Sequence, residues 1–133
     1  MALGTNELFS SATQDPFPRI KPVHVFSKTI SAITGGPELG VGFPLAFNTS
    51  TNKWVPWTTG GVNGTGTIRA FVYPDAIQSD ATDDVLGQIM IAGDIHHDDV
   101  LVPSGETQNN LTIALKAGLS ERGLYVTGIA AAY

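Results

Sequence analysis

Residues 89–103 read IMIAGDIHHDDVLVP, and this stretch says the most about the fold. It holds two of the three histidines and three of the twelve acidic residues, between an apolar run and a proline. The apolar run is typical of a strand, and Pro103 cannot donate a backbone hydrogen bond to continue one. The stretch is therefore either a strand pair that ends in a tight corner or a site for metal or acid–base chemistry.

The chemical interpretation depends on which side chains share a face. On a strand, Asp94, His96 and Asp98 would lie on one face, with His97 and Asp99 on the other. Two carboxylates and an imidazole can bind a divalent metal or transfer protons. Zinc sites usually take three or four protein ligands, however, and the sequence has no HExxH, GxSxG or calcium-loop motif.

We therefore favour the architectural interpretation, an exposed corner in which Asp99 accepts backbone N–H groups before Pro103. We expect no catalytic residues, no metal and no cofactor.

Length and composition set further limits. A chain of 133 residues can bury the core of one domain, and the absence of cysteine excludes disulfides and thiolate metal sites. No apolar stretch reaches the roughly 20 residues of a membrane span, and the N-terminus does not look like a secretory signal. We expect a soluble, unprocessed protein that does not bind membranes.

The charge is unevenly distributed along the chain. The net charge is −5, and there is no Lys or Arg between Arg69 and Lys116. Eight acidic residues fall in that interval: Asp75, Asp80, Asp83, Asp84, Asp94, Asp98, Asp99 and Glu106. A solvated acidic face of this kind repels phosphate groups, so we expect no binding to nucleic acid.

The N-terminal segment differs from the rest of the chain. Pro16, Pro18 and Pro22 exclude a helix there, yet the segment carries apolar side chains. It is either disordered or an extended arm that orders by adding a strand to a partner's sheet. We place the arm at residues 1–26 and the core at residues 27–133.

The remaining pattern predicts short strands separated by turns. Strands are expected at 23–30, 45–48, 53–57, 67–73, 85–93 and 124–129. One helix follows Pro103, with Ser104 or Thr107 as its cap, Leu111 and Leu115 as an apolar pair, and Gly118 at its end. The fold class is mainly β (a β-rich α+β domain), small and compact, with one short helix. Trp54 and Trp57 should lie on opposite strand faces, one in the core and one at a rim or interface.

Two blocks, KWVPW at 53–57 and DDVLVP at 98–103, carry a resemblance to a known family. Between them lie a Gly/Thr loop, the strand at 66–71 and the strand–Gly93–strand pair; a short helix and a closing strand at 124–126 follow. This order resembles the lambda-type head decoration proteins of tailed bacteriophages, over roughly residues 43–129.

The resemblance implies a non-enzymatic homotrimer on the outer surface of the capsid in the virion, assembled in the host cytoplasm. Its partner would be the major capsid protein, which the arm contacts by strand pairing. The arm does not align with the family's arm in sequence and is assigned by position. Candidate capsid-binding residues are Leu8, Phe9, Phe17, Ile20, Val23 and Val25. Candidates for the trimer interface or the core are Trp54, Trp57, Leu101 and Pro103. The family pattern does not include His96 and His97, which we expect to be solvated.

Other classes of protein remain open alternatives. One is a small metal-dependent or acid–base enzyme centred on Asp94, His96 and Asp98. Another is a different virion or tail module, or a glycan-binding domain that uses Trp54 and Trp57.

Overall fold

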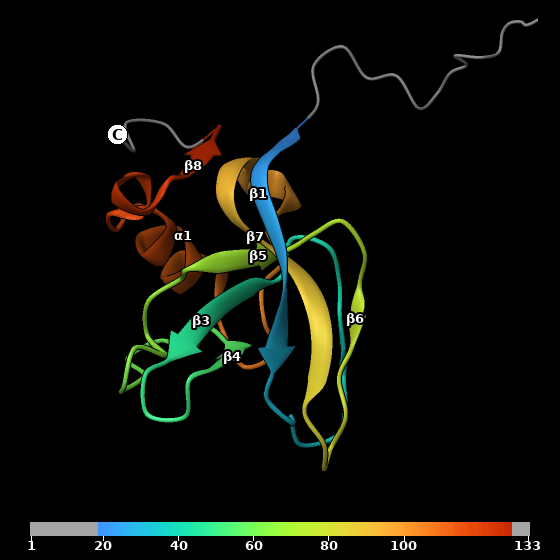
Figure 1. The fold of residues 1–133 in the computed structure, drawn as a ribbon. Coiled ribbons are helices and arrows are strands. Elements are labelled where there is room, and N and C mark those ends of the chain that lie inside the picture. Colours follow the sequence, from blue (N-terminus) through green and yellow to red (C-terminus); the bar gives the residue numbers. More distant parts are fainter. Residues whose placement is uncertain (1–18, 129–133) are drawn as a thin grey trace, which may run out of the picture.

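The structure, a computed structural model, describes residues 19–128 (Figure 1). It is mainly β with one short α-helix, which confirms the predicted fold class. The elements are β1 (Ile20–Ile30), β2 (Glu38–Leu39), β3 (Pro44–Asn48), β4 (Lys53–Pro56), β5 (Ala70–Val72), β6 (Ile77–Gln78), β7 (Val85–His96), α1 (Gln108–Leu115) and β8 (Leu124–Thr127), with 3₁₀ turns at His97–Asp99 and Leu119–Arg122.

The strands close into a small barrel. The sheet order is β1-β4-β3-β5-β7-β8, and a further pairing of β1 with β7 completes a ring of five strands. β8 pairs in parallel with the end of β7, and α1 lies near it on the same side of the molecule (Figure 1). The ring is weakest where β1 meets β4, because these two strands share only the pair Ile30↔Trp54.

β7 is one continuous strand and not the strand pair that we predicted. It runs through Gly93, whose φ of 140° suits glycine and few other residues. β1 passes close to Gly93, and its register shifts on either side of His24. The glycine therefore lets a long strand bend around the barrel without reversing direction.

β1 begins earlier than the predicted strand, and this corrects the boundary of the arm. Its ladder with β7 extends from Ile20↔Ile95 to Ile30↔Val85, so residues 20–26 belong to the barrel. Pro22 is tolerated because it lies at the bulge, where a ladder hydrogen bond is not required. The candidates Leu8, Phe9 and Phe17 lie outside the described residues.

Both tryptophans are buried, each in a different cluster of the core. Trp57 is 2% exposed and packs with residues of α1 and β8, whereas Trp54 is 9% exposed and packs with residues of β1 and β3. The prediction of opposite faces is consistent with this arrangement, but the prediction that one of them lies at a rim is wrong. Both faces of the sheet are buried here: on β3, Leu45 belongs to the cluster of Trp54 and Ala46 belongs to the cluster of Trp57.

The helix forms as the sequence predicts. The Thr107 hydroxyl accepts a hydrogen bond from the Asn110 N–H at 3.1 Å, which satisfies one of the unpaired donors of the first turn. Leu111 and Leu115 are buried against the barrel, and Gly118 follows the helix with a φ of 68°.

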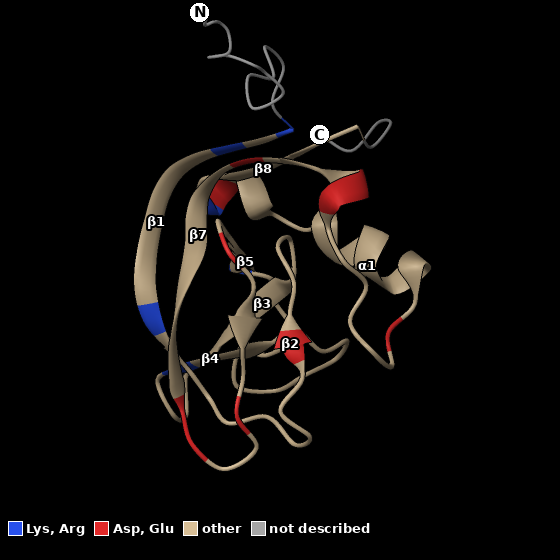
Figure 2. Cartoon of the chain, turned by 90° about the vertical axis from the view of Figure 1, so that its right-hand side faces the viewer, with Lys and Arg blue, Asp and Glu red and all other residues tan. Residues whose placement is uncertain are grey.

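The acidic residues do not form the single face that we predicted. Asp80, Asp83 and Asp84 precede β7, whereas Asp98 and Asp99 follow it, so the two groups lie at opposite ends of a long strand (Figure 2).

No helix among residues 19–128 is long and apolar enough to cross a membrane.

Candidate functional site

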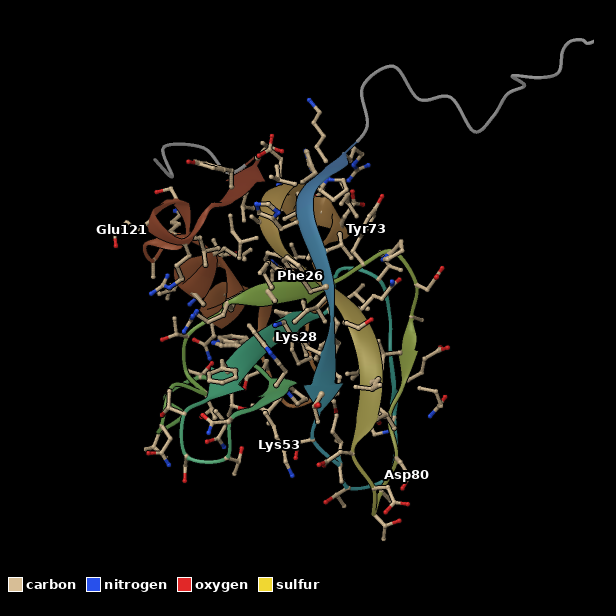
Figure 3. All side chains as sticks on the ribbon, in the orientation of Figure 1. Phe26, Lys28, Lys53, Tyr73, Asp80 and Glu121 are labelled. Atoms are coloured by element: carbon tan, nitrogen blue, oxygen red, sulfur yellow. The ribbon has the colours of Figure 1, made fainter. Side chains whose placement is uncertain are left out.

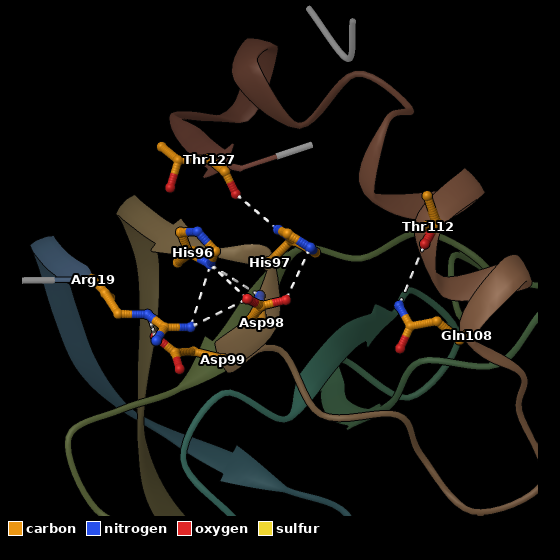
Figure 4. Close-up of polar contacts among 8 residues, drawn as sticks. All are labelled: Arg19, His96, His97, Asp98, Asp99, Gln108, Thr112 and Thr127. Carbon is orange, nitrogen blue, oxygen red and sulfur yellow. Dashed lines mark hydrogen bonds and ion pairs between the residues drawn. The ribbon is translucent and has the colours of Figure 1, made fainter. Parts of the chain in front are cut away.

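The corner, residues His96 to Asp99, joins the end of β7 to a 3₁₀ turn (Figure 4). The His96 Nδ1 accepts the backbone N–H of Asp98 at 3.1 Å and so caps the turn. We predicted this capping role for Asp99, whose carboxylate instead lies 3.1 Å from the Arg19 Nε.

The turn breaks the strand alternation and changes which groups meet. The predicted set of Asp94, His96 and Asp98 does not form; the groups that converge are His96, His97 and Asp98, with ligand atoms within 4.8 Å of one another. The His97 Nε2 lies 2.9 Å from an Asp98 oxygen, and the two imidazole rings stack with centroids 4.9 Å apart.

The contacts of His97 join the corner to β8. The His97 Nδ1 lies 3.4 Å from the Thr127 carbonyl oxygen, and its Nε2 faces the Asp98 carboxylate, so both ring nitrogens have polar partners in the chain. The His96 Nδ1 lone pair is already used by the Asp98 N–H.

Arg19 supplies positive charge to the corner. Its Nη2 lies 3.7 Å from Asp98, and its backbone carbonyl accepts the His96 N–H at 2.8 Å. The corner therefore fixes the point at which the chain enters β1. We did not single out Arg19 from the sequence, although it is the first basic residue of the chain and directly precedes a β-forming segment.

The side of β1 away from β7 is a second feature of interest, which we call the open edge. Over residues 20–29 it has no strand partner among residues 19–128. Val23 is 69% exposed and Phe26 45% exposed, whereas Ile20 and Val25 pack partly against the core. Of the predicted arm residues that the structure describes, Val23 is thus the one that a partner can reach freely.

The two blocks that carry the family resemblance meet in space. Trp57 and Val100 belong to the same core cluster, and Trp57 and Pro103 line one groove of about 750 Å³. Pro103 is buried and Leu101 is 40% exposed. The groove wall is mixed: it also carries the apolar residues Ile33, Pro37, Leu39, Phe43 and Pro56 and the polar residues Thr34, Glu38, Thr58, Ser104 and Glu106. The blocks therefore build the core and one wall of a groove, which local sequence patterns did not reveal.

No protein-family model matches the chain, and no curated protein matches it. A function for the chain therefore has to be inferred from its own residues and fold.

Proposed function

We propose that this chain is a capsid decoration protein, which binds the outer surface of a tailed-phage head as a homotrimer and stabilises the shell. The observation that carries the proposal is the open edge of β1, which leads directly back into the N-terminal segment. The resemblance of residues 43–129 to the lambda-type decoration proteins supplies the identity of the partner, the major capsid protein.

An exposed strand edge favours strand addition. Unpaired N–H and C=O groups along residues 20–29 offer main-chain hydrogen bonds to an incoming strand, although Pro22 has no N–H to give. Most proteins protect exposed strand edges of this length, because an unprotected edge can pair with a strand of another chain. Val23 and Phe26 add apolar contacts, so that the edge can bind a partner with little demand on the partner's sequence.

The groove beside Pro103 supports the trimer. Phe43, Pro37 and Pro56 line a surface depression into which side chains of a neighbouring subunit can pack. Three subunits that each present an open edge bind a shell with avidity, so each contact can be individually weak. A protein that binds only the assembled shell stabilises that state by mass action.

The corner has a structural role in this proposal. Its charged groups are partners of one another, and Arg19 holds the start of β1 against Asp98 and Asp99.

A glycan-binding function through Trp54 and Trp57 is disfavoured because neither ring presents a face to solvent.

The experiment is co-sedimentation of the purified protein with expanded, undecorated shells of the capsid protein encoded in the same genome. We expect saturable binding, with a trimer as the bound unit. Deletion of residues 1–18 should weaken binding and leave the barrel folded, because the β1 ladder begins at Ile20.

A matched pair of variants tests the open edge itself. Val23→Ser removes an exposed apolar side chain from β1, and Ile113→Ser does the same on α1, where the side chain is also exposed. We expect the first variant to weaken shell binding and the second to bind as the wild type does. Equal binding by both, together with full binding by the truncated protein, would overturn the role of β1.

A further inference from the structure

A small pocket opens where β1 and β4 diverge. The strands pair only at Ile30↔Trp54, and Trp54 and Lys28, two residues before Ile30, both line the pocket. Its volume is about 290 Å³, and its lining is completed by Arg69, Ile91 and Arg122. We call it the basic pocket.

The lining of the basic pocket is cationic, in a chain whose net charge is −5. Three of the seven Lys and Arg residues line it, and no acidic residue does. Lys28, Arg69 and Arg122 make no ion pair with any residue in the described range 19–128, whereas Arg19 and Lys53 are both paired.

Two of these cations are held in place by neutral groups. The Arg122 Nη1 donates to the Gly118 carbonyl at 2.8 Å. The Lys28 Nζ lies 5.4 Å from the centre of the Phe26 ring on the same strand (Figure 3). Neither contact neutralises the positive charge, and both leave donors that can bind an anion. Nothing in the described chain uses this charge.

We propose that the basic pocket binds a carboxylate side chain from an acidic segment of the protein that pairs with the open edge of β1. A strand added along this edge would run past Lys28, and its side chains would come over the pocket. Guanidinium groups bind carboxylates through paired, charge-assisted hydrogen bonds, and the apolar Trp54 and Ile91 keep water away from one side. The identity of the partner rests on the proposed function, but the chemistry of the pocket does not.

A protein carboxylate fits better than the phosphates of a nucleic acid. A polyphosphate needs an extended basic surface, and the overall negative charge of this chain repels it. One carboxylate needs only the few donors that converge here.

The first test uses the isolated protein. Acetyl-tetraglutamate-amide is titrated into ¹⁵N-labelled protein, with acetyl-tetraglutamine-amide as the matched uncharged peptide. We expect saturable shifts at Arg69, Arg122 and the Trp54 indole with the acidic peptide alone. Absence of these shifts would overturn the proposal, as would tighter binding of inorganic phosphate or of a single-stranded oligonucleotide at the same residues.

The second test uses expanded shells. The double variant Lys28→Gln/Arg69→Gln should bind shells about tenfold more weakly at low salt, and the deficit should shrink as salt is added. Lys116→Gln, at an exposed lysine outside the pocket, should bind as the wild type does. Wild-type protein that does not bind shells would contradict the proposed function. Wild-type and double-variant proteins that bind equally would contradict only the role of the pocket.

Discussion

The Arg19 Nε lies 3.1 Å from the Asp99 carboxylate, which ties the first described residue of the chain to the turn after β7. The residues around this contact also share a backbone hydrogen bond, from the His96 N–H to the Arg19 carbonyl. The acidic pair before Val100 thus has a structural partner, and the corner serves as the anchor of β1.

This anchor predicts a measurable coupling between the two residues. In a double-mutant cycle with Arg19→Gln and Asp99→Asn, we expect a coupling energy of about 0.5 kcal/mol, as for other exposed ion pairs. Urea denaturation measures it. Asp94→Asn serves as the control acid, because Asp94 makes no ion pair within residues 19–128, and its effect should add to that of Arg19→Gln. If the changes in the free energy of unfolding are additive in both cycles, Arg19 and Asp99 do not stabilise each other and the anchor is wrong.

The conformation and surroundings of Gly42 indicate that the corner packs closely on the barrel. Its φ is 90°, its carbonyl accepts the Leu101 N–H at 3.1 Å, and a Cβ there would collide with the Asp99 carbonyl oxygen. Gly42→Ala should lower the free energy of unfolding by about 3 kcal/mol or more, because both strain and overlap oppose it. Gly105→Ala is the control, with a φ of 88° and open space around the added carbon. It should cost only about 1 kcal/mol. Similar losses would show that the corner is free to move.

The contact between Asp84 and Lys53 predicts a pH dependence of stability. Lys53 Nζ lies 2.6 Å from the carboxylate, and together with the N–H of Ala32 it lowers the pKa of Asp84 from its ordinary value of 3.8. Because the pKa is lower in the folded chain, the contact stabilises the fold above the unfolded pKa and is lost as pH falls through the folded value.

Asp84→Asn should therefore lower the melting temperature at about pH 7 and converge with the wild type at about pH 2. Thermal denaturation monitored by circular dichroism measures both. Asp83→Asn is the neighbouring control, since Asp83 makes no ion pair in the described part of the chain. A constant difference between Asp84→Asn and wild type over this range would contradict the role of the carboxylate.

The local elements of this fold follow from local sequence, and the assembled features do not. Strand alternation placed Trp54 and Trp57 on different faces, but only the packing on both faces of the sheet shows that both are buried. The Thr107 cap and the Leu111–Leu115 spacing predict α1 because each acts within a few residues. The strand alternation failed at Asp98 because a 3₁₀ turn follows His96.

Features built from residues far apart in the chain could not be predicted from a single sequence. The basic pocket takes residues from β1, β4, β7 and the segments that precede β5 and β8. Each of its cations, taken alone, resembles an ordinary solvated side chain. Only the topology, in which β1 pairs with both β7 and β4, brings them together.

The contacts of His96 and His97 lead to a prediction about the effect of zinc on stability. Because the contact of His97 with the Asp98 carboxylate and the hydrogen bond from the Asp98 N–H to His96 already satisfy these groups, zinc should not raise the melting temperature of the protein, and a chelator should not lower it. His96→Ala should cost about 1 kcal/mol through loss of the cap, by analogy with helix caps. A rise in melting temperature with zinc that disappears in a His96→Ala/His97→Ala variant would instead establish a metal site.

The melting temperature of expanded, undecorated shells, measured as this protein is added, tests capsid stabilisation most directly. We expect a rise that saturates when the shell is fully occupied, because a ligand of the assembled state stabilises that state. The truncated protein lacking residues 1–18 should give a smaller rise at the same concentration. A shell melting temperature that stays unchanged with folded, full-length protein in excess would show that the protein does not stabilise capsids.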